Sequence, residues 1–356
     1  MTEIIYDNII YKLQKFGGIS TYWFELTKRL LNDQNFNSSF IEYKNENVFN
    51  RSLEIREGLI KMGRLPLFLE RFNNPKLNNY NQSFIFHSSY NRFSTNINAK
   101  NITTVHDLIH HKFYGGIRSL LHNYQKENAL SHSKAIITVS KNTKKDLLEV
   151  YPWLDPDLVH VIYNGVSSDY FIIDQEDYKY ENTQEILDQK YIVCVSSREP
   201  YKNFPLVIEV LHKLSDYKLY VVGPTLKEYE VQNLNNKIPN RWKAFTSISN
   251  KSLNEIYNHS AGMIYPSSYE GFGITILEAM KAGCPTVTLN TSSIPEVAGN
   301  GCVMIDEPDV TEFLKGFDTA INDRHTIIKK GLVQADKFSW DKCYQQTSAL
   351  YRSLNE

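Results

Sequence analysis

Two acidic residues, Glu270 and Glu278, flank a glycine-rich turn in the stretch YEGFGITILEAMKAG. Helix N-termini favour negative charge because their first amides are unpaired, so both acids could simply stabilise a helix end. Carboxylates only accept hydrogen bonds, which makes the hydroxyls of a sugar or a ribose their natural ligands. Helical side chains lean toward the N-terminus, so Glu278 can face a ligand from about a turn inside the helix while Glu270 reaches it from the loop. The spacing suits one ligand with hydroxyls at two ends and a charge between them.

Two basic residues, Arg198 and Lys202, follow an apolar stretch in VSSREPYKNFPLVIEVLHKL and precede a helical pattern. Two cations and a helix start would converge there on one point, which favours a diphosphate, because Arg can bind it bidentately and Lys supplies a compact charge. The alternative is a pair of solvated loop cations, and this segment alone does not separate the two.

A pair of glycines, Gly17 and Gly18, stands before another helical pattern in LQKFGGISTYWFELTKRL. Glycines at a helix N-terminus let the backbone approach a phosphate closely, although a tight turn alone would need them as often. The G-x-G-x-x-G spacing of a dinucleotide site is missing, which argues against a nicotinamide enzyme.

His106 and Asp107 come directly after a predicted strand in TTVHDLIHHKFYGG. A histidine at this place can donate to a ligand hydroxyl or act on a proton near neutral pH. A structural histidine and a metal site built from His106, His110 and His111 are the alternatives. The metal site is the weakest of the three, because no acidic partner follows at ligand spacing.

The elements that must position these residues alternate between short β-rich runs and amphipathic stretches of helical length, which is the pattern of parallel sheets with crossover helices. Because 356 residues exceed what one core usually serves, we expect an α/β protein with two doubly wound, Rossmann-like domains, 1–166 and 191–338, joined by an acidic linker at 167–190. Strands are predicted at 3–7, 38–43, 83–89, 101–107, 134–140, 159–165, 191–197, 218–223, 261–267, 285–289 and 301–306. Helices are predicted at about 18–32, 118–133, 141–150, 203–214, 273–283, 309–322 and 338–354.

Composition narrows the function classes. The four cysteines form no C-x-x-C pair, which suggests neither a disulfide framework nor a zinc site, and the N-terminal stretch does not resemble a signal peptide. With no apolar run of membrane-spanning length, we expect a cytoplasmic protein. Residues 1–165 hold 20 Lys and Arg against 15 Asp and Glu, so the first domain is basic while the net charge is −1. A near-neutral chain without a recognised module gives nucleic-acid binding little support.

Taken together, these residues resemble the retaining glycosyltransferases of family four, which have the GT-B fold. The E-x7-E motif is present as Glu270 and Glu278, and SREPYKN resembles the family's Arg and Lys segment for the donor diphosphate. GGIS, VHD, AIITVSKNTKKDL and VIYNGV look like family landmarks in the family's order. The ending FSWDKCYQQTSALY is similar to the last helix, here 339–356, which crosses back to the N-terminal domain.

The resemblance implies a donor site with named contacts. Arg198 and Lys202 would neutralise the leaving diphosphate without an obligatory metal or cofactor, Glu278 would hold the ribose, and Glu270 would hold the donor sugar. His106 would lie near the donor sugar and the acceptor. Further donor contacts would come from Gly17, Gly18 and Asp107, from the amides of Gly271, Phe272 and Gly273, and from those of Thr275 and Ile276.

The implied reaction moves a hexose from a nucleoside diphosphate sugar, GDP-mannose or a UDP-hexose, to a hydroxyl of a glycan or lipid-linked glycan acceptor with retained configuration. Synthesis of a cell-surface polysaccharide, such as lipopolysaccharide O-antigen or capsule, is the expected context. The alternatives are a non-catalytic nucleotide-sugar binding subunit and a nucleotide-sugar epimerase. Basic and apolar residues alternate at 51–72, which indicates either contact with anionic lipid at the inner face of the plasma membrane or an amphipathic core helix.

Overall fold

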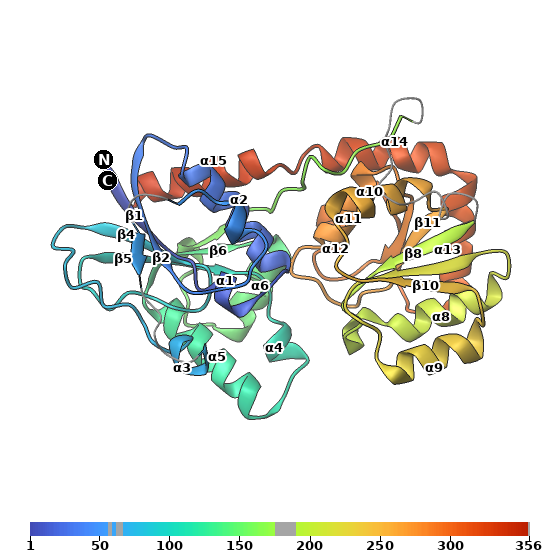
Figure 1. The fold of residues 1–356 in the computed structure, drawn as a ribbon, viewed down its shortest axis with the longest axis horizontal. Coiled ribbons are helices and arrows are strands. Elements are labelled where there is room, and N and C mark those ends of the chain that lie inside the picture. The colour runs from blue at the N-terminus through green and yellow to red at the C-terminus, as the bar shows by residue number, and fades with distance from the viewer. Residues whose placement is uncertain (56–58, 62–66, 175–189, 355–356) are drawn as a thin grey trace. The chain divides into compact units, whose positions relative to one another are not determined.

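The computed structural model describes residues 1–356 apart from 56–58, 62–66, 175–189 and 355–356. The chain forms two compact units, one of Met1–Gly165 with Trp340–Glu356 and one of Val166–Ser339. Each unit contains one sheet with helices around it (Figure 1), and every strand pairing among the described residues is parallel. This is the doubly wound α/β class predicted from the alternation of strands and helices.

Among the described residues, the sheet of the first unit has seven strands in the order β3-β2-β1-β4-β5-β6-β7. The chain order reverses between β1 and β4, and ligands of such sheets bind beyond the carboxyl ends of the strands at this point. The strands are β1 (Thr2–Asp7), β2 (Phe36–Glu42), β3 (Leu59–Lys61), β4 (Phe84–Ser88), β5 (Ala99–Val105), β6 (Ser133–Thr138) and β7 (Val159–Val161).

Helices of the first unit begin where the sequence supplies suitable start residues. Ser140 caps α6 by accepting a hydrogen bond from the amide of Thr143 at 2.9 Å, and Gly17 is the N-cap of α2. The helices are α1 (Ile10–Leu13), α2 (Gly18–Leu30), α3 (Leu67–Glu70), α4 (Ile109–Lys112), α5 (Gly116–Ser131), α6 (Lys141–Val150) and α15 (Trp340–Ser353), with short 3₁₀ turns at Asn50–Ser52 and Pro156–Leu158.

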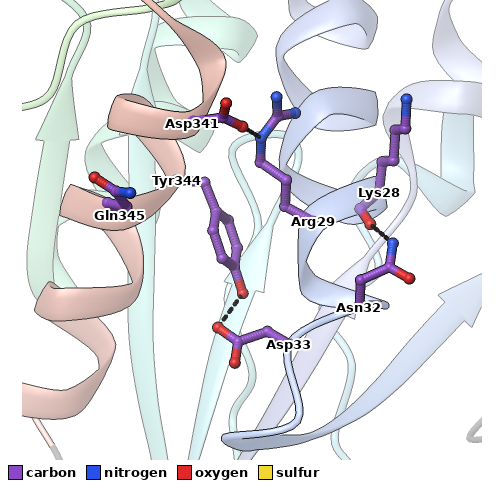
Figure 2. A pocket seen from close by; sticks show the side chains of 7 residues that line it. All are labelled: Lys28, Arg29, Asn32, Asp33, Asp341, Tyr344 and Gln345. Carbon is purple, nitrogen blue, oxygen red and sulfur yellow. Dashed lines mark hydrogen bonds and ion pairs between the residues drawn. The ribbon is translucent and has the colours of Figure 1, made fainter.

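The last helix, α15, packs against α2 although the two are more than 300 residues apart in the chain. Figure 2 shows the contacts that hold them: Arg29 Nε donates to Asp341 at 2.8 Å, and the Tyr344 hydroxyl donates to Asp33 at 2.9 Å. The shallow pocket between these side chains has a volume of about 460 Å³. Trp340–Glu356 therefore belongs to the first unit.

The sheet of the second unit has, in the part of the chain that the structure describes, six strands in the order β10-β9-β8-β11-β12-β13. Its chain order reverses between β8 and β11, so the loops after these two strands face each other across the reversal. The strands are β8 (Tyr191–Val195), β9 (Lys218–Val222), β10 (Trp242–Phe245), β11 (Gly262–Tyr265), β12 (Thr286–Leu289) and β13 (Val303–Ile305).

Helices cover the sheet of the second unit and enclose an aliphatic core that includes Val207, Leu219, Ile264 and Phe313. Asp309 caps α13 by accepting from the amides of Thr311 and Glu312. The helices are α8 (Phe204–Lys213), α9 (Glu228–Lys237), α10 (Asn250–His259), α11 (Ile274–Lys281), α12 (Ile294–Ala298), α13 (Val310–Asn322) and α14 (Arg324–Ala335), with a 3₁₀ turn at Pro200–Lys202.

The predicted linker, 167–190, lies largely outside the described residues. Its described beginning packs on the second unit, where the amide of Phe171 donates to Asn254 at 3.1 Å and that of Ile173 to Asn258 at 2.8 Å. The unit boundary at Gly165 lies next to the boundary predicted at residue 166.

The region 51–72 does not form one amphipathic helix in its described part. It contains the 3₁₀ turn at Asn50–Ser52, strand β3 and the short helix α3. The amphipathic core helix considered for this region is therefore wrong. Its bases Arg56 and Arg64 lie outside the described residues.

Candidate active site

The carboxyl edge of the second sheet joins two residues that the sequence placed 68 positions apart. Lys202 ends the turn after β8, and Glu270 lies in the loop after β11. The Lys202 ammonium donates a hydrogen bond to Oε1 of Glu270, and both side chains are only 11% exposed. A largely buried ion pair thus links the loops after β8 and β11, where the chain order of the sheet reverses.

Tyr265, the last residue of β11, completes the pair. Its hydroxyl donates to the same Glu270 oxygen at 2.5 Å and accepts from Lys202 Nζ at 3.2 Å. Burial, followed by the negative charge of Glu270, raises the pKa of Tyr265 far above its usual value, so the hydroxyl stays protonated and donates. A carboxylate offers about four acceptor sites, so Glu270 can accept a ligand hydroxyl in addition to the hydrogen bonds from Lys202 and Tyr265.

Hydrogen bonds between the loops fix the position of this pair. Asn203, with a positive φ of 50°, donates from Nδ2 to the carbonyl of Pro266 at 2.9 Å and to Oγ of Ser268 at 2.6 Å. The amide of Glu270 donates to Oγ of Ser292 at 2.9 Å. Ser293 Oγ donates to the carbonyls of Glu270 and Phe272. The loops after β8, β11 and β12 therefore hold one another.

The glycine turn opens helix α11. Gly273 is its N-cap with a φ of +96°, a conformation that side chains rarely adopt, so this position requires glycine. Phe272 is buried and packs edge-on against Phe338, with ring centroids 5.7 Å apart. The amide of Ile276, a predicted donor contact, donates to the carbonyl of Gly273 at 3.0 Å. The donor contacts predicted for Gly271 to Ile276 stay predictions.

Glu278 lies one turn inside α11, as its spacing from Glu270 requires. The residue is half-buried, and its carboxyl lies near the hydroxyls of Tyr170 and Tyr257. Burial raises the pKa of Glu278 to about 8, and the two hydroxyls only partly oppose this. Without a ligand, the carboxyl is therefore mainly protonated at neutral pH.

Arg198 is held by the protein rather than directed at Lys202. Its residue has a φ of +59°, and Nε donates to Glu230 at 3.1 Å while both atoms are buried. NH1 donates to the carbonyl of Ser196, and NH2 donates to those of Pro224 and Thr225. The guanidinium thus ties the loop after β8 to α9. Its predicted contact with a diphosphate stays a prediction, and it would require exchange of some of these acceptors.

Two further features lie beside Arg198. A pocket of about 620 Å³ is lined by Arg198, Glu230 and Pro308 among others, whereas Lys202 and Glu270 are not among its lining residues. Gly223 allows the loop after β9 to approach β8, because a Cβ there would come within 2.2 Å of the Ser196 carbonyl oxygen. At Gly223, therefore, the loop after β9 packs directly against the backbone that follows β8.

The glycine pair of the first unit forms the start of α2. The carbonyl of Gly17 accepts from the amide of Thr21 at 2.9 Å and from Oγ of Ser20 at 2.8 Å. A Cβ on Gly17 would meet the Gln14 side chain at 2.8 Å, whereas one on Gly18 would meet nothing within 4 Å. Packing within the first unit therefore requires no glycine at position 18, which leaves room for the predicted approach of a phosphate.

His106 follows β5, and its ring lies edge-on to Tyr22 with centroids 4.9 Å apart. Burial lowers the pKa of His106 to about 4, so the imidazole is neutral at physiological pH. The Asp107 carbonyl accepts from Lys126, and its Oδ1 accepts from the amide of Ile109. Both remain predicted donor-side residues.

The metal alternative for this histidine cluster has no geometric support in the part of the chain that is described. His110 stacks on His122 at a centroid distance of 4.0 Å. No group of three or more His, Cys, Asp and Glu side chains among the described residues has metal-binding geometry.

Three contributors to the candidate site were missed in the sequence. Tyr265 carried a usable signal, because it is the last residue of a predicted strand and precedes the glycine turn. Tyr170 and Ser292 carried none, since one lies in the segment taken as a linker and the other in a loop after β12.

Two protein-family models match the chain, and each covers mainly one of its two units. Residues 16–170 match the model described as Glycosyltransferase Family 4, and residues 176–333 match that described as Glycosyl transferases group 1.

The chain belongs to the family-four glycosyltransferases of group 1. The resemblance seen in E-x7-E and its companion motifs is thereby confirmed.

Curated relatives share about a quarter of the aligned residues. The chain is 28% identical over 238 residues to the O-antigen chain mannosyltransferase B of Escherichia coli. The aligned region covers 64% of this chain and 62% of that protein. It is 26% identical over 213 residues to the O-antigen chain mannosyltransferase RfbU of Salmonella typhimurium, covering 58% and 56%. The chain thus spans less than two thirds of the length of these relatives.

Solved structures share the fold over nearly the whole chain. HepE from Anabaena, solved with UDP and glucose, has a TM-score of 0.76 at 16% identity and covers 99% of this chain and 100% of its own. WaaG, described as a glycosyltransferase involved in lipopolysaccharide biosynthesis, has a TM-score of 0.73 at 15% identity and covers 98% and 99%. The group 1 glycosyltransferase fold, GT-B, is therefore confirmed for this chain.

Proposed function

We propose that this protein transfers a hexose from a nucleoside diphosphate sugar to a hydroxyl of a glycan acceptor, with retention of the anomeric configuration. The observation that carries the proposal is the buried contact between Lys202 and Glu270 at the chain-order reversal of the second sheet. One cation and one carboxylate there match the two needs of such a donor, a charge for the diphosphate and an acceptor for sugar hydroxyls.

The donor would extend along α11. The Glu270 carboxylate would accept a hydroxyl of the sugar, and Glu278 would accept the ribose hydroxyls from one turn further along the helix. Lys202 would contact the diphosphate between them. The contacts predicted for Arg198, Gly17, Gly18, His106 and Asp107 belong to this proposal as well.

Catalysis would follow from the change in charge during the reaction. As the glycosidic bond breaks, negative charge grows on the leaving diphosphate and positive charge on the sugar ring. A fixed ammonium aimed at the leaving group then stabilises the transition state more than the ground state. Lys202 would be the cation in this mechanism, which requires no metal or other cofactor.

Mannose is the first sugar to test, because the curated relatives named above are O-antigen mannosyltransferases. A UDP-hexose is the second, because HepE was solved with UDP and glucose. Synthesis of lipopolysaccharide O-antigen or a capsule is the proposed context. Membrane contact through 51–72 also stays a proposal, and none of the described helices is long and apolar enough to cross a bilayer.

The test is a panel of nucleotide sugars, including GDP-mannose and UDP-glucose, assayed for enzyme-dependent release of the nucleotide with and without EDTA. We expect one donor to be hydrolysed well above the others, with no loss in EDTA. Release of an altered nucleotide sugar would indicate an epimerase, and binding without turnover of any donor would indicate a non-catalytic subunit. With an acceptor in hand, NMR of the product reads its anomeric configuration.

A further inference from the structure

Helix α5 exposes its apolar face to solvent. Four large apolar residues, Ile117, Leu120, Leu121 and Tyr124, are 76%, 68%, 46% and 64% exposed. They recur at positions i, i+3, i+4 and i+7, which places them along one stripe of the helix. A surface helix of a soluble domain normally turns such a stripe toward the core.

Up to Lys126 the buried face of α5 is polar instead, and specific contacts fix it. Ser119 Oγ donates to the carbonyl of His110 at 2.5 Å, and Lys126 Nζ donates to that of Asp107 at 2.7 Å. Gln125 exchanges two hydrogen bonds with Arg71, at 3.0 Å and 2.8 Å. Because Ser119, Gln125 and Lys126 have defined partners inside, the outward orientation of the apolar stripe is set by the fold.

The exposed apolar surface continues before the helix. Phe113 and Tyr114, in the turn between α4 and α5, are 45% and 38% exposed. Within the twelve residues 113–124, six large apolar side chains therefore face solvent. Clusters of this kind on a soluble protein mark a surface that something else covers.

Charge indicates what covers it. The segment from Leu108 to Lys126 contains no Asp or Glu, but it holds three Lys or Arg and three His. Of these, His111 and Arg118 are exposed beside the apolar residues, whereas Lys112 pairs with Asp146 at 2.6 Å and Lys126 is buried. Two copies of this face would bring Arg118 and His111 close to their counterparts, and the segment itself has no carboxylate to pair them, which disfavours a symmetric dimer. An anionic lipid surface complements both the charge and the apolar stripe.

We propose that residues 113–124, in the turn before α5 and the first half of that helix, dock the first unit onto an anionic lipid bilayer. The helix would lie in the plane of the membrane, with Ile117, Leu120 and Leu121 below the headgroups and Arg118 among them. Tyr114 and Tyr124 suit the interface, where aromatic rings have one apolar and one wet side. The surface differs from that predicted at 51–72, and the proposal does not depend on which sugar the enzyme transfers.

Flotation of the full chain with lipid vesicles tests this surface. Vesicles of phosphatidylcholine with about 30% phosphatidylglycerol are compared with phosphatidylcholine alone at about 0.1 M salt. We expect the protein to float only with the anionic vesicles. Ile117→Gln with Leu120→Gln should lower its partition coefficient at least about tenfold, because two apolar side chains no longer enter the bilayer. Arg118→Glu should weaken binding to the anionic vesicles by a smaller factor.

The matched control changes two apolar residues that are exposed elsewhere, Ile97→Gln and Val333→Gln, at 96% and 61% exposure. This control should float like the unchanged protein. Release of nucleotide from the donor in solution should be the same in all variants, which separates failure of this proposal from failure of the proposed function. The proposal is overturned if the unchanged protein floats with neither vesicle, or if the α5 variant floats as well as the control. A dimer in light scattering that the α5 variant dissociates would also overturn it, with a second copy as the occupant.

Discussion

The ammonium of Lys202 donates to Oε1 of Glu270 across the point where the strand order of the second sheet reverses. If Lys202 is the cation that stabilises the leaving diphosphate, Lys202→Ala should lower kcat/KM for the donor by about 10² to 10³-fold. Steady-state nucleotide release measures this. Lys213→Ala, at the exposed end of α8, is the matched control and should leave turnover unchanged.

The same ion pair predicts a separable effect on stability. Lys202→Ala leaves the Glu270 carboxylate buried without its cation, so the free energy of unfolding in urea should fall by about 3 kcal/mol. The double variant Lys202→Met with Glu270→Gln removes both charges and should recover most of that loss, but none of the activity. Recovery of turnover in the double variant would show that Lys202 acts only through the fold.

The raised pKa of Glu278 predicts how donor binding depends on pH. Its carboxyl must ionise to accept ribose hydroxyls, so affinity for the nucleotide sugar should rise with pH up to about 8, by as much as about tenfold per pH unit. Isothermal titration between pH 6 and 8.5 measures this. In Glu278→Gln the affinity should be weaker and nearly flat with pH, and a parallel slope in that variant would assign the effect to another group.

Without a ligand, the same group should lower the stability of the fold as pH rises. The folded glutamate keeps its proton up to about pH 8, whereas the unfolded one releases it at its ordinary value near 4.5. Its contribution is fully present below the unfolded value and is lost as pH rises through about 8. Urea unfolding at several pH values should therefore show a fall between about pH 5 and 8 that Glu278→Gln reduces.

We expect Arg198 to contribute more to the stability of the fold than to the binding of a diphosphate. Because its guanidinium is buried on Glu230, Arg198→Ala should lower the free energy of unfolding by about 3 kcal/mol. Arg198→Ala with Glu230→Gln should restore part of it. If the single variant instead keeps its stability and loses only turnover, Arg198 contacts the diphosphate, as the sequence predicted.

Gly18 offers a test of the first unit. Since a Cβ there meets nothing within 4 Å, Gly18→Ala should leave the melting temperature unchanged. If the backbone at Gly18 approaches the donor, KM for the nucleotide sugar should rise several-fold. Gly115→Ala, which also meets nothing within 4 Å, is the control. Equal kinetics in the two variants would remove Gly18 from the donor site.

Strands were easier to predict than polar helices, for a physical reason. All eleven predicted strands exist, because β-branched runs such as YIVCV are buried on both faces of a parallel sheet. β10, with the sequence WKAF, was missed because its exposed residues give no apolar run. The helices α9 and α10 were missed because Asn and charged residues dominate them.

For the site, local sequence indicates which residues follow a strand but not where long side chains point. Lys202 and Glu270 were predicted as separate contacts, and their shared hydrogen bond depends on the order of β8 and β11. The direction of Arg198 depends on Glu230, 32 residues away, which no local pattern encodes. The apolar period of α5 likewise predicts a helix without indicating that its polar face is buried.

The central claim is that the edge carrying Lys202, Glu270 and Glu278 binds a nucleoside diphosphate sugar. Isothermal titration of the purified protein with UDP, GDP, UDP-glucose and GDP-mannose in EDTA tests it most directly. We predict that one base binds in both its free and its sugar-linked forms, and that Lys202→Ala with Glu278→Gln abolishes this binding in a protein that remains folded. If none of the four ligands binds at millimolar concentration, or if the variant binds as well as the unchanged protein, the claim is contradicted.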